Sequence, residues 1–159
     1  MTLPEQERER FCQVLHHSRT SLYRLAFSIT RNSSDAQEAV AEAVCRAYER
    51  YPQLREKEKL PRWLLKITAN EARRLCQRRG RTVSLDDLPT EPAIPGRETG
   101  DDTLWQAVQT LPRDQREAVV LFYYEDLPTE EIARIVGTSP GAVRVRLSRA
   151  REKLRSILE

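Results

Sequence analysis

Apolar residues recur at intervals of three or four along most of the chain, which is the spacing of helices with one buried face. Between residues 11 and 29 this spacing predicts one long helix, with Ser18 as its candidate break. Its inner face comprises Phe11, Leu15, Leu22, Ala26 and Ile29. No stretch alternates convincingly between apolar and polar residues, as a half-buried strand would. The pattern therefore predicts an all-α protein.

Two further helices are expected before residue 80. Ser34 or Asp35 is predicted to start the first, whose apolar positions run from Ala36 to Ala47. After Pro52 and a charged loop, Pro61 is predicted to open a helix that continues to Arg79, because proline is favoured in a first helical turn. Trp63 on this helix is interpreted as a core side chain; the alternative is that it stacks on a nucleic-acid base.

Residues 80–102 interrupt the helical pattern. They contain three prolines and three glycines and show little periodicity, which is typical of an extended linker. Beyond them, helices are predicted over residues 103–110 and 113–124, with Pro112 and Pro128 marking the breaks. The sequence thus predicts two small helical domains, residues 1–79 and 103–159, joined by a flexible linker.

The last 31 residues predict two short helices around a tight turn. Thr129 is a suitable N-cap for the first, and Gly137 suits the left-handed backbone that often follows a helix end. Ser139 is expected to cap the second helix, with Pro140 at its first position. Together the turn residues indicate a helix-turn-helix.

The second of these helices separates apolar and basic residues. One face carries Val143, Leu147, Ala150 and Leu154, and the other carries Arg144, Ser148, Arg151 and Arg155. Residues 139–156 hold six basic side chains and one acid, whereas a merely solvated helix face, which is the alternative, usually mixes the two signs. A helix of this kind fits the major groove of DNA, where arginine binds phosphates and guanine edges.

Charge is segregated along the chain. The net charge is +3, but residues 1–79 carry 16 basic and 10 acidic side chains, and residues 80–102 carry 2 and 6. Two basic domains joined by an acidic strip indicate a polyanionic partner that is contacted in two places. No apolar run has the roughly 20 residues of a membrane span and the N-terminus does not resemble a signal peptide, so a cytoplasmic protein without membrane insertion is expected.

The sequence offers little for catalysis. Cys12, Cys45 and Cys76 lie far apart with no C-x-x-C pair, so they are interpreted as buried small hydrophobic residues; a zinc or redox role is the alternative. No nucleophile–base pair or metal-ligand cluster is evident. We therefore expect no enzymatic activity, no cofactor and no metal.

Both domains resemble those of bacterial RNA polymerase sigma factors of the extracytoplasmic-function (ECF) group. The residues that carry the likeness are LYRLAFSITRNSSDAQEAVAEAVCRAYERY and LPRWLLKITANEARRLCQRR in the first domain, and LPRDQREAVVLFYYEDLPTEEIARIVGTSPGAVRVRLSRAREKLR in the second. They are similar to sigma regions 2 and 4, and their order and the intervening linker agree. The resemblance implies a promoter-specificity subunit that directs core polymerase to −10 and −35 elements and assists promoter melting.

The resemblance also assigns partners to surfaces. Asp35, Glu38 and Glu42 have helical spacing and would form an acidic ridge on the polymerase clamp; their alternative role is solvation of the helix. The pattern typical of the family, DAED, appears here as DAQE, and Ala41 replaces a usual glutamine. Further expected partners are the polymerase flap, promoter DNA and an anti-sigma factor. The free chain is expected to be a monomer.

Two helices are implicated in reading promoter DNA. By the resemblance, the helix from Pro61 to Arg79 binds the −10 region, where an amide can contact a base and basic side chains contact phosphates. The expected −10 residues are Lys66, Asn70, Arg73, Arg74 and Arg78. The last helix is expected to read the −35 element, with Arg144 and Ser148 on base edges and Arg146, Arg149 and Arg151 on phosphates.

Two other functions stay open at this point. One is a stand-alone helix-turn-helix regulator, which would dimerise on a palindrome without polymerase. The other is a regulatory interaction protein whose main state is sequestration by a partner. These two functions differ in the partner that the acidic ridge and the basic helices would bind, so binding experiments can distinguish them.

Overall fold

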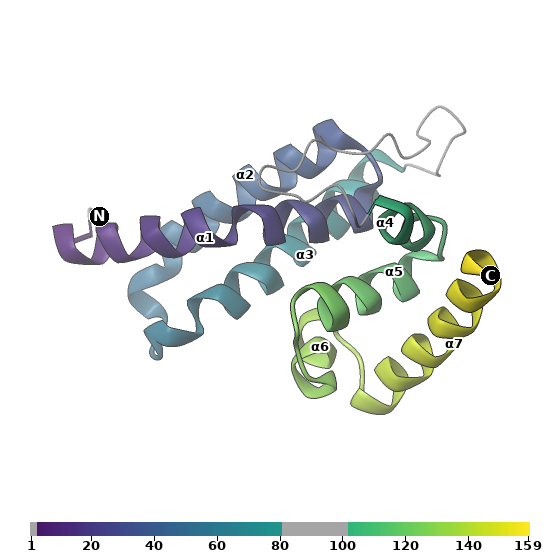
Figure 1. The fold of residues 1–159 in the computed structure, drawn as a ribbon. Helices are drawn as coiled ribbons and strands as arrows, with labels where there is room; N and C mark the ends of the chain where they lie inside the picture. The colour runs from purple at the N-terminus through teal and green to yellow at the C-terminus, as the bar shows by residue number, and fades with distance from the viewer. Residues whose placement is uncertain (1–2, 81–101) are drawn as a thin grey trace.

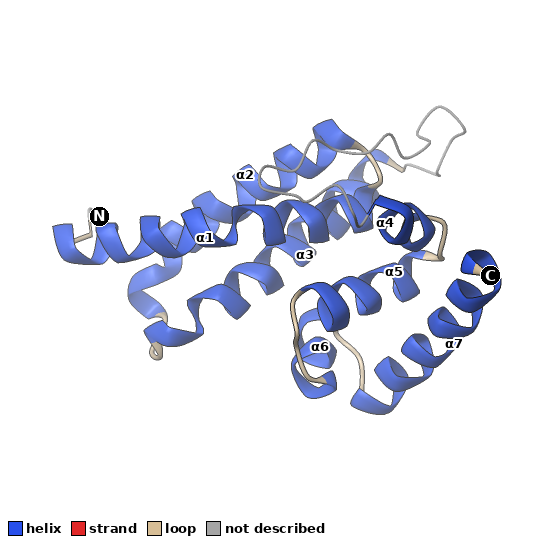
Figure 2. Cartoon of the chain, in the orientation of Figure 1, coloured by secondary structure: helices blue, strands red, loops and turns tan. Residues whose placement is uncertain are grey.

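The computed structural model describes residues 3–80 and 102–159, and in these two ranges every regular element is a helix (Figures 1 and 2). The predicted all-α class is confirmed. The predicted linker falls almost wholly outside the described residues. Three helices form the first domain, namely α1 (Glu5–Thr30), α2 (Ser33–Arg50) and α3 (Leu60–Arg79).

Helix α1 runs through Ser18 without interruption, so the predicted candidate break is wrong. Its C-terminal half is enclosed by α2 and α3, and Leu22, Leu25 and Ile29 are fully buried there. The helix ends at Arg31, whose φ of 51° places it in the left-handed region and whose N–H donates to the carbonyl of Phe27. This tight ending turns the chain directly into α2.

Helix α2 begins one or two residues earlier than predicted. Its cap is Asn32, whose side-chain oxygen accepts the N–H of Asp35 at 2.9 Å. Four alanines, at positions 36, 39, 43 and 47, form its buried face. Because alanine has almost no side chain, α2 lies close against α1 and α3.

The predicted third helix is confirmed as α3, with Pro61 in its first turn and Gly80 at its end. Gly80 has φ of 57° and therefore takes the left-handed conformation that glycine adopts cheaply. Before α3, the chain forms two short 3₁₀ turns, Tyr51–Gln53 and Lys57–Lys59. Trp63 packs half-buried against the core, as the favoured interpretation proposed.

The second domain contains α4 (Asp102–Gln109), α5 (Arg113–Val119), α6 (Thr129–Val136) and α7 (Pro140–Leu158). The single helix predicted over residues 113–124 changes character after Val119: Val120–Tyr124 form a π-helical turn, labelled η5. A π turn holds one extra residue, which sequence periodicity over so short a span does not distinguish from an α turn.

The helix-turn-helix is confirmed, with one difference at its start. Pro128 occupies the N-cap of α6 and Thr129 is already helical. Gly137 has φ of 77° at the end of α6, and the Ser139 hydroxyl accepts the N–H of Ala142 to cap α7. The four apolar positions predicted for α7, Val143 to Leu154, are buried.

The two domains pack against each other, with α5 and η5 on α1 and with α6 on α3 (Figure 1). Phe27 of α1 and Trp105 of α4 meet with ring centroids 6.4 Å apart, and both are buried. Within the described ranges, no helix is sufficiently long and apolar to cross a bilayer.

Candidate nucleic-acid and protein interfaces

The three carboxylates predicted to form an acidic ridge on α2 differ in exposure. Glu38 and Glu42 are about half exposed, whereas the Asp35 side chain is 2% exposed and lies in an ion pair with Arg79. Arg79 also pairs with Glu38 at 2.7 Å. The ridge that a partner can reach therefore consists of Glu38 and Glu42, and Asp35 instead ties the start of α2 to the end of α3.

A groove of about 290 Å³ separates the acidic side of α2 from the basic side of α3. Its lining residues are Glu38, Ala39, Glu42, Arg46, Glu71, Arg74, Leu75 and Arg78. Arg46 crosses the groove and pairs with the buried Glu71 at 2.7 Å, and it also lies 3.3 Å from Glu42. Glu71 in turn lies 3.4 Å from Arg74. Alternating charges thus connect the two predicted binding surfaces.

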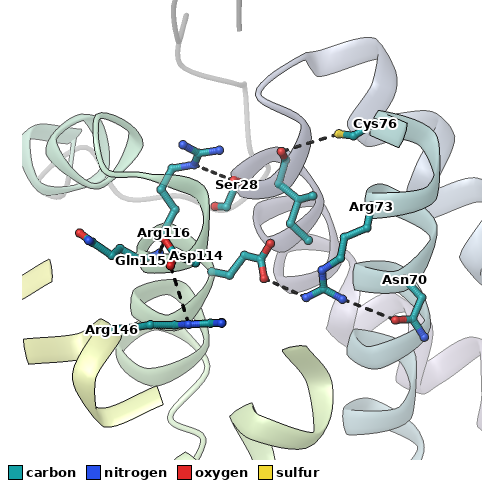
Figure 3. A network of polar contacts seen from close by, with 10 residues as sticks. Ser28, Asn70, Arg73, Cys76, Asp114, Gln115, Arg116 and Arg146 are labelled. Carbon is teal, nitrogen blue, oxygen red and sulfur yellow. Dashed lines mark hydrogen bonds and ion pairs between the residues drawn. The ribbon is translucent and has the colours of Figure 1, made fainter. Parts of the chain in front are cut away.

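The five predicted −10 residues divide into two groups along α3. Arg74 and Arg78 line the groove beside α2. Lys66, Asn70 and Arg73 follow one another at helical spacing, and Asn70 and Arg73 lie where α3 approaches the second domain (Figure 3). Arg73 donates to Asn70 Oδ1 at 3.5 Å and to Glu117 Oε2, across the domain boundary, at 2.8 Å.

Three of the five predicted −35 residues are exposed on α7, namely Arg144, Ser148 and Arg149. An additional exposed side chain between them is Val145.

The other two predicted −35 residues contact their own domain. Arg146 lies 3.9 Å from Asp114, and the guanidinium of Arg151 donates to the Tyr123 hydroxyl (Figure 3 shows the first contact). Arg151 also lies over the rings of Phe122 and Tyr123. An arginine held in this way is oriented before it meets a phosphate, which lowers the entropy lost on binding.

Burial marks two charged residues that the sequence interpretation did not single out. Arg116 is 4% exposed and Glu117 is 3% exposed, although both are charged. Arg116 Nε donates to the Ser28 carbonyl and its Nη1 to the Leu111 carbonyl, each at 2.7 Å. Burial lowers the pKa of Arg116 to about 10, so it remains charged at neutral pH. Each lies four residues before a buried apolar residue, Val120 or Leu121, and this spacing was a signal in the sequence.

The cysteine interpretation is correct only for Cys76. This thiol is buried and donates to the Ile29 carbonyl, while Cys12 and Cys45 are exposed. Among residues 3–80 and 102–159, no three His, Cys, Asp or Glu side chains gather as a metal site would require.

Comparison with known proteins agrees with both domain resemblances. Residues 14–82 match the family described as Sigma-70 region 2, and residues 101–154 match Sigma-70, region 4. The chain is 33% identical over 135 residues to RNA polymerase sigma factor SigV of Bacillus subtilis, a match that covers 84% of this chain and 81% of that protein. It is 32% identical over 143 residues to ECF RNA polymerase sigma factor EcfG of Rhodopseudomonas palustris, covering 87% and 79%.

A similar solved structure is the sigma factor RpoE in complex with the anti-sigma factor NepR from Bartonella quintana. The TM-score is 0.76 at 26% identity, and the match covers 93% of this chain and 96% of that one.

Proposed function

The chain belongs to the sigma-70 family of RNA polymerase sigma factors, in its ECF group, and on that premise we propose which of its surfaces carry out promoter-specific initiation of transcription. Residues 1–79 would bind core polymerase and the −10 element, and residues 103–159 the −35 element. The linker of residues 80–102 would connect them.

The observation that carries this assignment is the exposed stripe of Arg144, Ser148 and Arg149 on α7. It faces away from the buried residues Val143 and Leu147 of the same helix. A capped helix whose outer face is polar and basic can enter the major groove while its inner face stays in the domain core. Arg144 and Ser148 would read base edges, whereas Arg149 and the pre-oriented Arg146 and Arg151 would contact phosphates.

The first domain would use two neighbouring surfaces. Glu38 and Glu42 would meet a basic part of the polymerase clamp, with Asp35 holding α2 in place beneath them. Along α3, Asn70 would contact an unstacked base of the −10 strand, and Lys66, Arg73, Arg74 and Arg78 would contact its phosphates. The short 3₁₀ turns before α3 would form one wall of the pocket for that base.

Catalysis would reside in the polymerase, and the sigma factor itself would have no enzymatic activity. We further propose that it works in the cytoplasm, is a monomer when free, contacts the polymerase flap through the second domain, and is held inactive by an anti-sigma factor. The last point is supported by the similarity to RpoE, which was solved with the anti-sigma factor NepR.

Reconstituted transcription tests the proposal. The chain is added to sigma-free bacterial core polymerase and a genomic DNA pool, and the 5′ ends of the transcripts are mapped. We expect starts downstream of a shared pair of −10 and −35 sequences. The absence of promoter-dependent starts with core enzyme from the source organism would refute it.

Gel shifts separate this function from that of a stand-alone regulator. A sigma factor should bind promoter DNA tightly only when core polymerase is present, since the polymerase fixes the spacing of its two weak sites. A regulator would shift a palindromic site equally well without polymerase.

A further inference from the structure

Val145 is a large apolar side chain on the outer face of the basic helix α7. Its exposed fraction is 48%, and Arg144, Ser148 and Arg149, which surround it on the helix, are exposed as well. A single apolar side chain on a protein surface is ordinary and by itself needs no function. What distinguishes Val145 is its position, which is opposite the buried face of a helix proposed to enter DNA.

Helix geometry places Val145 opposite the side chains that hold α7 in its domain. The four buried side chains of α7 are Val143, Leu147, Ala150 and Leu154. Because successive residues are turned by about 100°, Val145 is roughly 140–180° round the helix from each of them. Arg144 is only about 60–120° from the same four positions. In the first two turns of α7, the side chain most directly opposite the core is therefore a valine and not an arginine.

Two arginines flank Val145 on opposite sides, and each contacts its own domain. Arg146, about 100° round the helix in one direction, lies 3.9 Å from Asp114. Arg151, about 120° round in the other direction, donates to the Tyr123 hydroxyl. Phosphate backbones form the two walls of the major groove, so arginines on both sides of the helix fit both walls. A helix held between them presents Val145 to the base edges on the floor of the groove.

The guanidinium of Arg144 lies about one turn before Val145 on the same helix. A Cβ added to Gly141 would be 3.8 Å from Arg144 Nη2, so this end of the arginine lies beside a residue without a side chain. Gly141 and Val145 are four residues apart and share a helix face. One helical turn rises about 5.4 Å and one base pair about 3.4 Å. Val145 should therefore face a base pair within about two steps of the one that Arg144 is proposed to read.

Valine discriminates between bases because its side chain has no hydrogen-bonding atom. The apolar group that bases present in the major groove is the 5-methyl group of thymine. Against the valine, the donors and acceptors of the other base edges would lose water without gaining a partner, which is unfavourable. Contact with the thymine methyl instead removes apolar surface of both partners from water. The same side chain thus favours thymine and disfavours the alternatives.

From this position and this chemistry we propose that Val145 is a specificity-determining residue for the −35 element, and that it packs on the 5-methyl group of a thymine, on either strand, within about two base pairs of the base pair read by Arg144. The proposal rests on the proposed function of α7 as the −35-reading helix. It extends that function to a residue that forms no hydrogen bond through its side chain. Promoters of this sigma factor should therefore carry a thymine at one fixed place in the −35 element.

Selection from a promoter pool with a randomised −35 region locates the base pair that Val145 faces. Holoenzyme made from the full chain and bacterial core polymerase selects the bound sequences, using wild type, Arg144→Ala and Val145→Ala. Alanine suits an exposed helical position, so the Val145→Ala chain should fold. We expect the wild-type pool to contain a thymine within about two base pairs of the position whose preference Arg144→Ala relaxes, and the Val145→Ala pool to lose this thymine.

A second measurement removes the methyl group and nothing else. Deoxyuridine in place of that thymidine keeps the base pair and its hydrogen-bonding edge but lacks the 5-methyl group. Wild-type holoenzyme should bind the deoxyuridine promoter about fourfold more weakly than the thymidine promoter, whereas Val145→Ala holoenzyme should bind both within about twofold. Ile157→Ala is the matched control, because Ile157 is an apolar residue near the end of the same helix with an exposed fraction of 49%. It should show the wild-type ratio.

Equal losses on the deoxyuridine promoter for wild type and Val145→Ala would overturn the inference, because the methyl group would then act through DNA shape and not through the valine. Absence of a loss in wild type, or a wild-type pool without such a thymine, would overturn it as well.

Failure of the proposed function would look different. If no pool shows any −35 preference and no promoter-dependent starts are found, α7 has no −35 role at all. If the −35 preference is present and Arg144→Ala relaxes it, but binding is indifferent to the thymine methyl group, the role of Val145 fails alone.

Discussion

Neighbouring carboxylates on α2 serve different purposes because one of them is buried. Asp35→Asn should lower the free energy of unfolding by about 1–2 kcal/mol, since the ion pair with Arg79 loses its charge in a largely dehydrated place. Glu38→Gln and Glu42→Gln should change unfolding by less than about 1 kcal/mol, as partly exposed pairs usually do. Urea denaturation measures these differences.

Binding to core polymerase should show the reverse order. Competition for core enzyme against a labelled reference sigma factor should detect a loss for Glu38→Gln and Glu42→Gln, while folded Asp35→Asn protein should compete nearly as well as wild type. A larger loss for Asp35→Asn than for the two exposed acids would show that the clamp reaches the buried end of the ridge.

Two arginines of α7 should affect promoter binding in distinct ways. Arg144→Ala in the holoenzyme should relax sequence preference at the −35 element by about 1–3 kcal/mol, because a base-edge contact distinguishes base pairs. Arg149→Ala should weaken binding to all promoters alike and reduce the slope of log K, the binding constant, against log salt concentration by about 1. Both predictions are tested by measuring binding to promoters with altered −35 sequences at several salt concentrations. If both substitutions lowered affinity equally for every sequence, the two roles would be wrongly assigned.

The exposure of a side chain could be predicted from the sequence when it depended only on the residue's own helix. The exposure of Arg144 and Ser148 followed from the periodicity of α7 alone. The burial of Asp35 did not, because it depends on Arg79, which lies 44 positions later in the chain. Periodicity gives the direction of a side chain on its helix but not what another helix places over it.

At the scale of elements, replacing either of two glycines in the helix-turn-helix by alanine should change the stability of the domain in opposite directions. Gly137→Ala should destabilise the domain by about 1–2 kcal/mol, because φ is 77° there and a side chain opposes the left-handed backbone. Gly141→Ala should be neutral or stabilising by up to about 1 kcal/mol, since Gly141 is helical and an added Cβ would meet only ordinary contacts, with Arg144 Nη2 at 3.8 Å and Ser139 Oγ at 4.0 Å.

Thermal unfolding of both variants, followed by circular dichroism, compares them under identical conditions. Gly141→Ala is the control for adding a methyl group to this turn, so the difference between the variants isolates the backbone effect. Equal melting temperatures would contradict the conformational explanation for the end of α6.

The helices and turns were largely predictable because the residues that determine them lie close together in the sequence. Ser139, Pro140 and Gly137 identify the turn and both helix ends from a few adjacent residues, and the alanine face of α2 follows from spacing. The start of α2 was misjudged because Asn32, Ser33 and Ser34 are all competent caps, and geometry alone selects Asn32. The π turn at Val120–Tyr124 escaped detection since its buried residues also suit an α-helix.

At the scale of the whole molecule, the contact between domains was beyond the sequence interpretation. Each domain has its own periodic helices, and nothing in that periodicity distinguishes a separated pair from a packed one. The cross-boundary contacts of Arg24, Arg73 and Arg116 involve residues between 44 and 101 positions apart. In the structure, the buried charges of Arg116 and Glu117 on α5 mark this boundary.

Packing between the domains should couple their unfolding, and the chain has a tryptophan in each to report it. Trp63 lies in the first domain and the buried Trp105 in the second, so Trp63→Phe and Trp105→Phe isolate the two fluorescence signals. In otherwise wild-type protein, the two urea transitions should coincide, as they do when one cooperative unit unfolds.

Arg116→Lys should separate the two urea transitions. A single ammonium group cannot donate to the carbonyls of both Ser28 and Leu111 as the guanidinium does. Losing a hydrogen bond from a charged group costs about 1.5–3 kcal/mol. Arg113→Lys, an exposed position on the same helix, should leave the transitions together. Transitions that are already separate in the wild-type background, or that remain joined in Arg116→Lys, would mean that the buried arginine stabilises its own domain and not the contact between the domains.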